Sequence, residues 1–253
     1  MQIDYISDLH ITHYTQSKKG IQTFVDRLIP KDNADILIIA GDISEYANDI
    51  IHTLEAFSKY YPKIFFVFGN HDLYLTTTKQ IKKYNANSNT KIEEIKQHFE
   101  NHSHVEILDN TLTTYQELTI AGSKNWYTLK NPQDEFFWRY HMADSTYIYP
   151  KTFEASEALH QEDTTFLTQI PANLDILITH VPPIHMPNST HKPNGCFYHW
   201  SPTFPEPKLW VAGHQHTSGS TQLGSTMLYL NPYGYPKEIA NPGIKTINYY
   251  PKL

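Results

Sequence analysis

Short, nearly continuous apolar runs constrain the fold of this chain more than any other feature. Residues 35–41 (DILIIAG), 63–69 (KIFFVFG) and 174–180 (LDILITH) are apolar almost throughout. Runs of this length and composition suit strands that are buried on both faces of a sheet. Residues 208–213 and 226–231 are two more candidates of the same kind. The chain is therefore expected to build at least one buried, largely parallel sheet.

Helical segments lie between these runs. Residues 1–7 alternate apolar and polar side chains and predict a strand, and residues 104–108 and 111–121 predict a pair of β segments around the turn signal Asp109-Asn110. Helices are predicted over residues 21–29, 48–60, 88–101 and 152–169. The alternation predicts an α/β sandwich with sheets inside and helices outside. No linker-like stretch divides the chain, so a single domain over 1–253 is expected.

Composition narrows the class of partner. The chain has 253 residues and a formal net charge of −6, with no basic block, which disfavours polymeric nucleic acid as a partner. No apolar run reaches the roughly 18 residues of a membrane span, and an acidic residue stands where a signal peptide would be basic. The single cysteine, Cys196, excludes an intramolecular disulfide framework. We expect a cytoplasmic protein without a membrane partner, in an oligomeric state that the sequence leaves open.

Metal-ligand and acid–base side chains follow five of the predicted strands. In open α/β sheets, ligands bind beyond the carboxyl ends of the strands, so these side chains are expected to meet at one edge. They are Asp8 and His10 after the first strand, Asp42 after the second, Asn70, His71 and Asp72 after the third, His180 at the end of the next, and His214 and His216 after the last.

The chemistry of this set favours a metal centre. Its oxygen and imidazole groups are too many for one ion with an open position, and they suit two ions that share a carboxylate. Mixed nitrogen and oxygen ligation without thiolate favours Mn, Fe, Zn, Ni or Co over Mg or Ca. Each residue alone has an ordinary alternative: Asp42 as a helix N-cap, Asn70 as a left-handed turn residue. Five such ordinary roles at five strand ends would be an improbable coincidence, so the metal centre is the favoured interpretation.

The motifs in which these residues stand resemble those of the calcineurin-like metallophosphoesterase family, in the same order and at similar intervals. They are Asp8-Leu9-His10, Gly41-Asp42, Gly69-Asn70-His71-Asp72, Thr179-His180 and Gly213-His214-Gln215-His216. Three further segments resemble a small bacterial and phage-type subgroup of these phosphoesterases: Trp126-Tyr127, Met142-Ala143-Asp144 and Asn231-Pro232-Tyr233-Gly234-Tyr235-Pro236.

The resemblance implies a four-layer α/β/β/α sandwich and a hydrolase of small phosphoesters. It implies that a hydroxide bridging two divalent ions attacks phosphorus, that His71 protonates the leaving group as a general acid, and that Asp72 orients and charges His71. It also implies two ligand sets: Asp8, His10, Asp42 and His216 for the first ion, and Asp42, Asn70, His180 and His214 for the second.

Two other functions compete with this one. A non-catalytic scaffold of the same fold would be expected to lose His71 or several ligands, and this chain keeps them all. A nuclease of the family would be expected to carry a basic groove, which the net charge disfavours. Lys124 and Arg139 are candidate phosphate contacts. The preference for monoesters or diesters stays open, as do the roles of the proline-rich segment 182–207 and the aromatic run 136–141.

Overall fold

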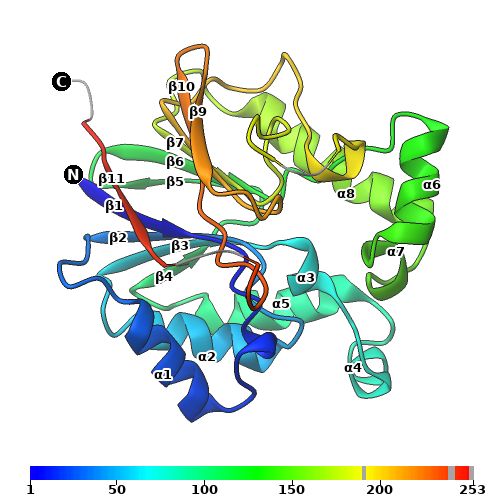
Figure 1. The fold of residues 1–253 in the computed structure, drawn as a ribbon, viewed down its shortest axis with the longest axis horizontal. Helices are drawn as coiled ribbons and strands as arrows, with labels where there is room; N and C mark the ends of the chain where they lie inside the picture. Colours follow the sequence, from blue (N-terminus) through cyan, green and yellow to red (C-terminus); the bar gives the residue numbers. More distant parts are fainter. Residues whose placement is uncertain (190–191, 239–242, 251–253) are drawn as a thin grey trace.

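Two β-sheets form the centre of the structure and lie face to face, with helices on their outer sides (Figure 1). The computed structural model describes residues 1–189, 192–238 and 243–250. This arrangement confirms the predicted α/β fold, with mixed sheets inside and helices outside. None of the helices in these ranges combines the length and apolar character that a bilayer-spanning helix requires.

The first sheet has the strand order β11-β1-β2-β3-β4. Strands β1 to β4 run parallel to one another, and β11 pairs antiparallel with β1. The carboxyl ends of β1, β2 and β3 therefore point the same way. The strands are β1 (Gln2–Ile6), β2 (Ile36–Ala40), β3 (Lys63–Val67), β4 (Val105–Ile107) and β11 (Lys245–Asn248).

The second sheet has the order β5-β6-β7-β8-β10-β9. Its four inner strands run parallel, and the two edge strands, β5 and β9, are antiparallel to their neighbours. The carboxyl ends of β7 and β8 thus lie on one edge. The strands are β5 (Thr111–Tyr115), β6 (Leu118–Ser123), β7 (Ile176–Thr179), β8 (Leu209–Ala212), β9 (Gly219–Leu223) and β10 (Thr226–Leu230).

Helices α1, α2 and α5 lie beneath the first sheet, and α8 lies on the outer side of the second (Figure 1). The side chains of Ser17 and Thr152 cap α1 and α8 by accepting bonds from backbone N–H groups. The longer helices are α1 (Lys18–Leu28), α2 (Ala47–Phe57), α5 (Ser88–Phe99), α6 (Pro132–His141) and α8 (Phe153–Gln169). The short ones are η1 (Ile11–His13), α3 (Asn70–Leu73), α4 (Thr78–Lys83), α7 (Asp144–Tyr147) and η2 (Gly195–Phe197).

A layer of apolar side chains joins the two sheets. Ile38 and Phe65 from the first sheet pack with Ile120, Ile178 and Val211 from the second, and all five are fully buried. The alternate residues of β2 and β3 face the helices instead, in a second apolar cluster. Because these strands are covered on both faces, they contain the continuous apolar runs seen in the sequence.

The structure differs from the sequence-based expectation around residues 104–121. The predicted β segment at 111–121 is two strands, because Gln116 and Glu117 adopt positive φ and turn the chain back on itself. Strands β4 and β5 belong to different sheets, so Asp109-Asn110 marks the crossing between sheets. Strands β9 and β11 and helices α4, α6 and α7 were not predicted from the sequence.

The described part of the proline-rich segment 182–207 packs onto the protein. Met186 and Phe204 are buried in the cluster that covers the outer face of the second sheet, and Cys196 is fully buried. His199 is only 5% exposed, and neither ring nitrogen has a hydrogen-bond partner among the described residues. This segment therefore covers the second sheet as α8 does.

Because His199 is buried, we expect the free energy of unfolding to fall as the pH is lowered. Burial, and then the nearby His160, lower the pKa of His199 to about 3, from an ordinary value near 6.5. As pH falls from about 6.5 toward 3, the unfolded chain binds a proton that the folded chain rejects. The free energy of unfolding should therefore fall by up to about 1.4 kcal/mol per pH unit from this group.

Urea unfolding of the wild type and of His199→Leu at pH 7 and pH 5 checks this expectation. The variant should lose less stability between the two pH values than the wild type does. Equal losses in the two proteins would show that His199 does not contribute to the acid sensitivity.

Candidate metal centre

The structure brings all seven predicted metal ligands together at one edge of the sandwich. Their strands belong to both sheets: β1, β2 and β3 to the first, β7 and β8 to the second. The site therefore lies where the carboxyl edges of two facing sheets meet, rather than along one sheet. The ligands are Asp8, His10, Asp42, Asn70, His180 and His214, which are buried, and His216, which is largely buried.

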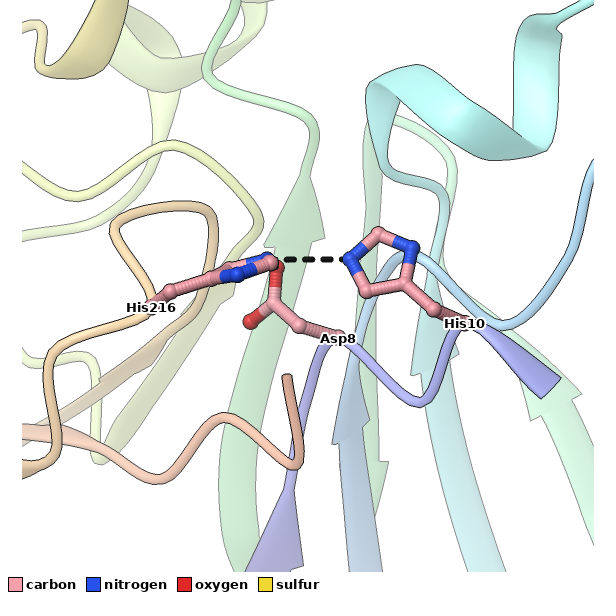
Figure 2. Close-up of side chains that lie close together, drawn as sticks. All are labelled: Asp8, His10 and His216. Carbon is pink, nitrogen blue, oxygen red and sulfur yellow. Dashed lines mark hydrogen bonds and ion pairs between the residues drawn. The ribbon is translucent and has the colours of Figure 1, made fainter. Parts of the chain in front are cut away.

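One group of side chains surrounds the end of β1. The Nε2 atoms of His10 and His216 lie 2.9 Å apart, and the Asp8 carboxylate lies 3.5 Å from His216 Nε2 (Figure 2). These three residues form a cluster whose donor atoms could hold one ion. Asp42 approaches the same cluster, with Oδ2 3.9 Å from His10 Nε2.

A second group lies toward the other sheet. The Asn70 oxygen is 2.9 Å from His180 Nε2 and 3.1 Å from His214 Nδ1, and the two imidazole nitrogens are 3.2 Å apart. Asp42 Oδ2 lies 3.4 Å from His180 Nε2. The same carboxylate thus borders both groups, which is the position that a shared ligand requires.

Hydrogen bonds at the far side of three imidazoles show which nitrogen faces the site. A carbonyl or carboxylate oxygen can only accept, so the ring nitrogen beside it carries a proton, and in the neutral imidazole the other nitrogen presents a lone pair. These partners are the carbonyl oxygens of Ala40 (2.9 Å from His180 Nδ1) and Cys196 (3.0 Å from His214 Nε2), and the carboxylate of Glu238 (2.7 Å from His216 Nδ1).

The resulting donor set fits metal ions. The Asn70 oxygen and, in the neutral imidazole, His180 Nε2 are both lone-pair atoms, yet they face each other at 2.9 Å. Such pairs repel unless a cation or a proton lies between them. His10 Nδ1 is also buried with no partner in the described part of the chain. Carboxylates, imidazoles and one amide oxygen together match the ligands of Mn, Fe, Zn, Ni or Co.

The shifted pKa values of the clustered histidines also favour a bound cation. Burial lowers the pKa of His10 to about 3 and that of His214 to about 4. Burial opposes a charge on His180, but the Asp42 carboxylate, the Asp8 carboxylate and the Ala40 carbonyl oxygen together outweigh it and raise the pKa of His180 to about 9. Positive charge is therefore favoured beside the buried carboxylate, in the place where a cation would lie.

The backbone at the site is held in an unfavourable conformation. Residues other than glycine rarely adopt positive φ, and doing so costs about 1–3 kcal/mol each. Gly41 also has a φ of +86°, and a Cβ there would lie 2.4 Å from His180 Nδ1, so no larger residue fits. The ligands with positive φ are Asp8, His10, Asp42, His214 and His216.

His71 lies beside the cluster, and its partner differs from the predicted one. Asp72 was expected to orient His71, but its carboxylate accepts bonds from the backbone N–H groups of Asp42, Ile43, Ser44 and Gly69. Instead, His71 Nδ1 lies 2.9 Å from the carboxylate of Glu45. The orienting role expected of Asp72 is therefore corrected to Glu45, while Asp72 shapes the loop that carries Asp42.

Sequence reasoning missed Glu45, although it stands only three residues after Asp42. Its carboxylate also accepts a bond from Thr12 at 2.6 Å, and the buried Lys91 donates to the Glu45 carbonyl oxygen at 3.1 Å. Burial opposes a charge on His71, but the carboxylates of Asp42 and Glu45 raise the pKa of His71 above its ordinary value. These two carboxylates therefore favour the protonated form of the imidazole.

A cavity of about 250 Å³ opens beside the cluster and His71. Tyr74, Met142 and Phe197 give it apolar walls, and Tyr235 and Glu238 border it from the C-terminal segment. The Tyr235 ring stacks on His10, and its hydroxyl lies 3.3 Å from His71 Nε2. The sequence showed Tyr235 only as part of a resemblance to a subgroup and gave no sign of Glu238, and the structure places both at the site.

Comparison with known proteins agrees with this geometry. Residues 1–218 match the calcineurin-like phosphoesterase family, and the chain belongs to that family. It is therefore a metal-dependent hydrolase that acts on phosphoric ester bonds. The chain is 24% identical to the uncharacterized protein L509 of Acanthamoeba polyphaga mimivirus over 267 residues, covering 94% of this chain and 92% of that protein.

A second relative is the [acyl-carrier-protein] phosphodiesterase PptH of Mycobacterium tuberculosis, 35% identical over 71 residues. That match spans 28% of this chain and only 20% of the relative. The crystal structure of phosphopantetheinyl hydrolase (PptH) from the same organism superposes with a TM-score of 0.73 at 18% identity, covering 99% of this chain and 98% of that one. At this identity the superposition shows a shared fold.

The shared position of Asp42 leads to a prediction about metal content. Asp42→Asn should lose metal from both groups, because one carboxylate borders both, whereas His216→Ala and His180→Ala should each lose one ion. Elemental analysis of the dialysed proteins, after loading with Mn²⁺, measures this. Two ions per chain retained in Asp42→Asn would contradict the shared role.

Proposed function

We propose that the chain hydrolyses small phosphodiesters, with two divalent ions held by the seven clustered ligands and His71 as the general acid. The observation that carries this proposal is the His71–Glu45 pair on the wall of the cavity, directly beside Asp42 and Asn70. Asp8, His10, Asp42 and His216 would hold the first ion, and Asp42, Asn70, His180 and His214 the second. Mn, Fe, Zn, Ni or Co suits these ligands.

The bound ions supply an activated water and neutralise charge on the phosphoryl oxygens. The chain supplies the proton for the leaving group. Because Glu45 accepts from His71 Nδ1, the Nε2–H of a protonated His71 faces the cavity. A leaving oxygen bound there can take this proton as its bond to phosphorus breaks. The Tyr235 hydroxyl beside Nε2 offers a second contact for the same oxygen.

The walls of the cavity support a diester rather than a monoester. None of the described residues that line it is Lys or Arg, whereas Asp42 and Glu238 add negative charge. The two candidate phosphate contacts are engaged elsewhere: Lys124 with Asp109 and Asp163, and Arg139 with Glu135. A monoester dianion would bring an extra negative charge that no Lys or Arg of the described lining meets, and a diester would not.

The name of the PptH relative, a phosphodiesterase acting on an acyl carrier protein, supports the same class. A carrier protein bearing phosphopantetheine is therefore one diester to assay. The apolar cavity walls suit an uncharged organic group next to the phosphate. The presence of His71 and of every candidate ligand favours an enzyme over a scaffold, and the absence of Lys and Arg from the described lining of the cavity disfavours a nuclease. We also propose that residues 1–253 act as a single domain, since both sheets share one apolar layer.

The acid role of His71 predicts a dependence on the leaving group. His71→Asn should keep its metal, but its rate should fall by roughly 10²–10⁴-fold on an ester with an alkoxide leaving group. The loss should be smaller with p-nitrophenolate, which leaves without a proton. Glu45→Gln should show the same pattern with a smaller loss. Equal losses on both substrates, at unchanged metal content, would remove the acid role.

Charge selection predicts a preference between two matched substrates. Bis(p-nitrophenyl) phosphate and p-nitrophenyl phosphate share a leaving group and differ in charge. One unmatched charge near carboxylates costs about 1–4 kcal/mol, so kcat/KM should be at least about tenfold higher for the diester. Met142→Lys should narrow the gap, and Met142→Gln should not. A monoester preference in the wild type would contradict the proposed selectivity.

A further inference from the structure

Asp144, the first residue of α7, is a buried carboxylate. It lies on the side of Asn70 that is opposite to His180 and His214. It makes no ion pair with any Lys, Arg or His in residues 1–189, 192–238 and 243–250. A buried carboxylate without a cation is costly unless several donors satisfy it. The groups that donate hydrogen bonds to Asp144 therefore decide whether this buried charge is tolerated.

Three neutral groups donate to this carboxylate. The Asn70 side-chain nitrogen donates to Asp144 Oδ1 at 2.8 Å. The hydroxyls of Tyr74 and Tyr127 donate to Oδ1 and Oδ2 through short hydrogen bonds. Asn70 is 74 positions away in the chain, so only the tertiary fold brings the two together.

The amide of Asn70 has two N–H donors, and both are used on this side. One donates to Asp144, and the other donates to the Tyr74 hydroxyl at 2.9 Å. The amide oxygen must then face the opposite way, toward His180 Nε2 and His214 Nδ1. Only the oxygen of an amide can bind a metal ion, because the nitrogen lone pair is delocalised into the carbonyl.

We propose that Asp144 is a positioning residue that fixes the Asn70 amide with its oxygen toward the second metal position. This inference rests on the ligand set of the proposed function. Without the Asp144 acceptor, the amide can rotate and turn its N–H groups toward the ions. Partners of this kind, which orient a ligand without touching the metal, typically contribute 10–100-fold to metal affinity.

The proposal also explains two segments whose roles the sequence left open. Tyr127 belongs to Trp126-Tyr127, and Asp144 belongs to Met142-Ala143-Asp144. Neither segment contains a residue of the ligand set. In the structure they meet behind Asn70, and they hold one of the ligands in place.

Site-selective metal binding tests the proposal. Calorimetric titration of the metal-free chain with Mn²⁺ should show one class of site weakened by 10–100-fold in Asp144→Asn, with the other unchanged. Tyr74→Phe, which removes the other acceptor of the Asn70 amide, should weaken the same class. It also serves as the second test if Asp144→Asn does not fold, a condition that circular dichroism reveals.

Asp4→Asn is the matched control. Asp4 is also fully buried and accepts a bond from a tyrosine hydroxyl, that of Tyr61, but it lies in the middle of β1, before the residues of the cluster. This variant should bind both ions as the wild type does, even if it is less stable. If Asp144→Asn, or Tyr74→Phe in its place, binds both ions with wild-type affinity, the proposal is overturned.

An Asn70→Ala variant separates this inference from the proposed function. If Asn70→Ala loses one class of metal site while Asp144→Asn binds both ions with wild-type affinity, only the role of Asp144 is wrong. If Asn70→Ala keeps both ions at full affinity, the ligand set itself is wrong, and the role of Asp144 falls with it.

Discussion

The site depends on one buried carboxylate that two sheets share. Asp42 follows β2 in the first sheet, yet Oδ2 lies 3.4 Å from His180 at the end of β7 in the second sheet and 3.9 Å from His10. A buried carboxylate is tolerated only among opposite charges or donors. The two sheets must therefore be packed at a fixed offset, and the apolar layer that contains Ile38 and Ile178 sets that offset. The packing of the two sheets therefore determines the geometry of the site.

Beyond the proposed ligands, a second set of polar groups contacts the side chains of the site. The Glu238 carboxylate contacts His216 Nδ1, the Asp144 carboxylate accepts a bond from the Asn70 amide, and the Glu45 carboxylate contacts His71 Nδ1. Each group contacts one functional side chain from a different part of the chain. The left-handed backbone at five ligands shows that the structure bears strain to keep this arrangement.

The sequence allowed prediction of the central strands and of the seven clustered candidate ligands, for a physical reason. Strands covered on both faces require unbroken apolar runs, and parallel strands deliver the residues that follow them to one edge. Edge strands such as β9 and β11 escaped prediction because one face is polar and the runs are short. Glu45 and Asp144 escaped it because their roles depend on side-chain orientation and on contacts between distant segments, which no local pattern records.

A crystal of the Mn²⁺-loaded protein, with diffraction collected at the manganese absorption edge, tests the central claim most directly. Two anomalous peaks are expected on either side of the Asp42 carboxylate, about 3.5–4 Å apart, one against His10 and His216 and the other against Asn70, His180 and His214. A single peak, or two peaks that do not share Asp42, would contradict that claim.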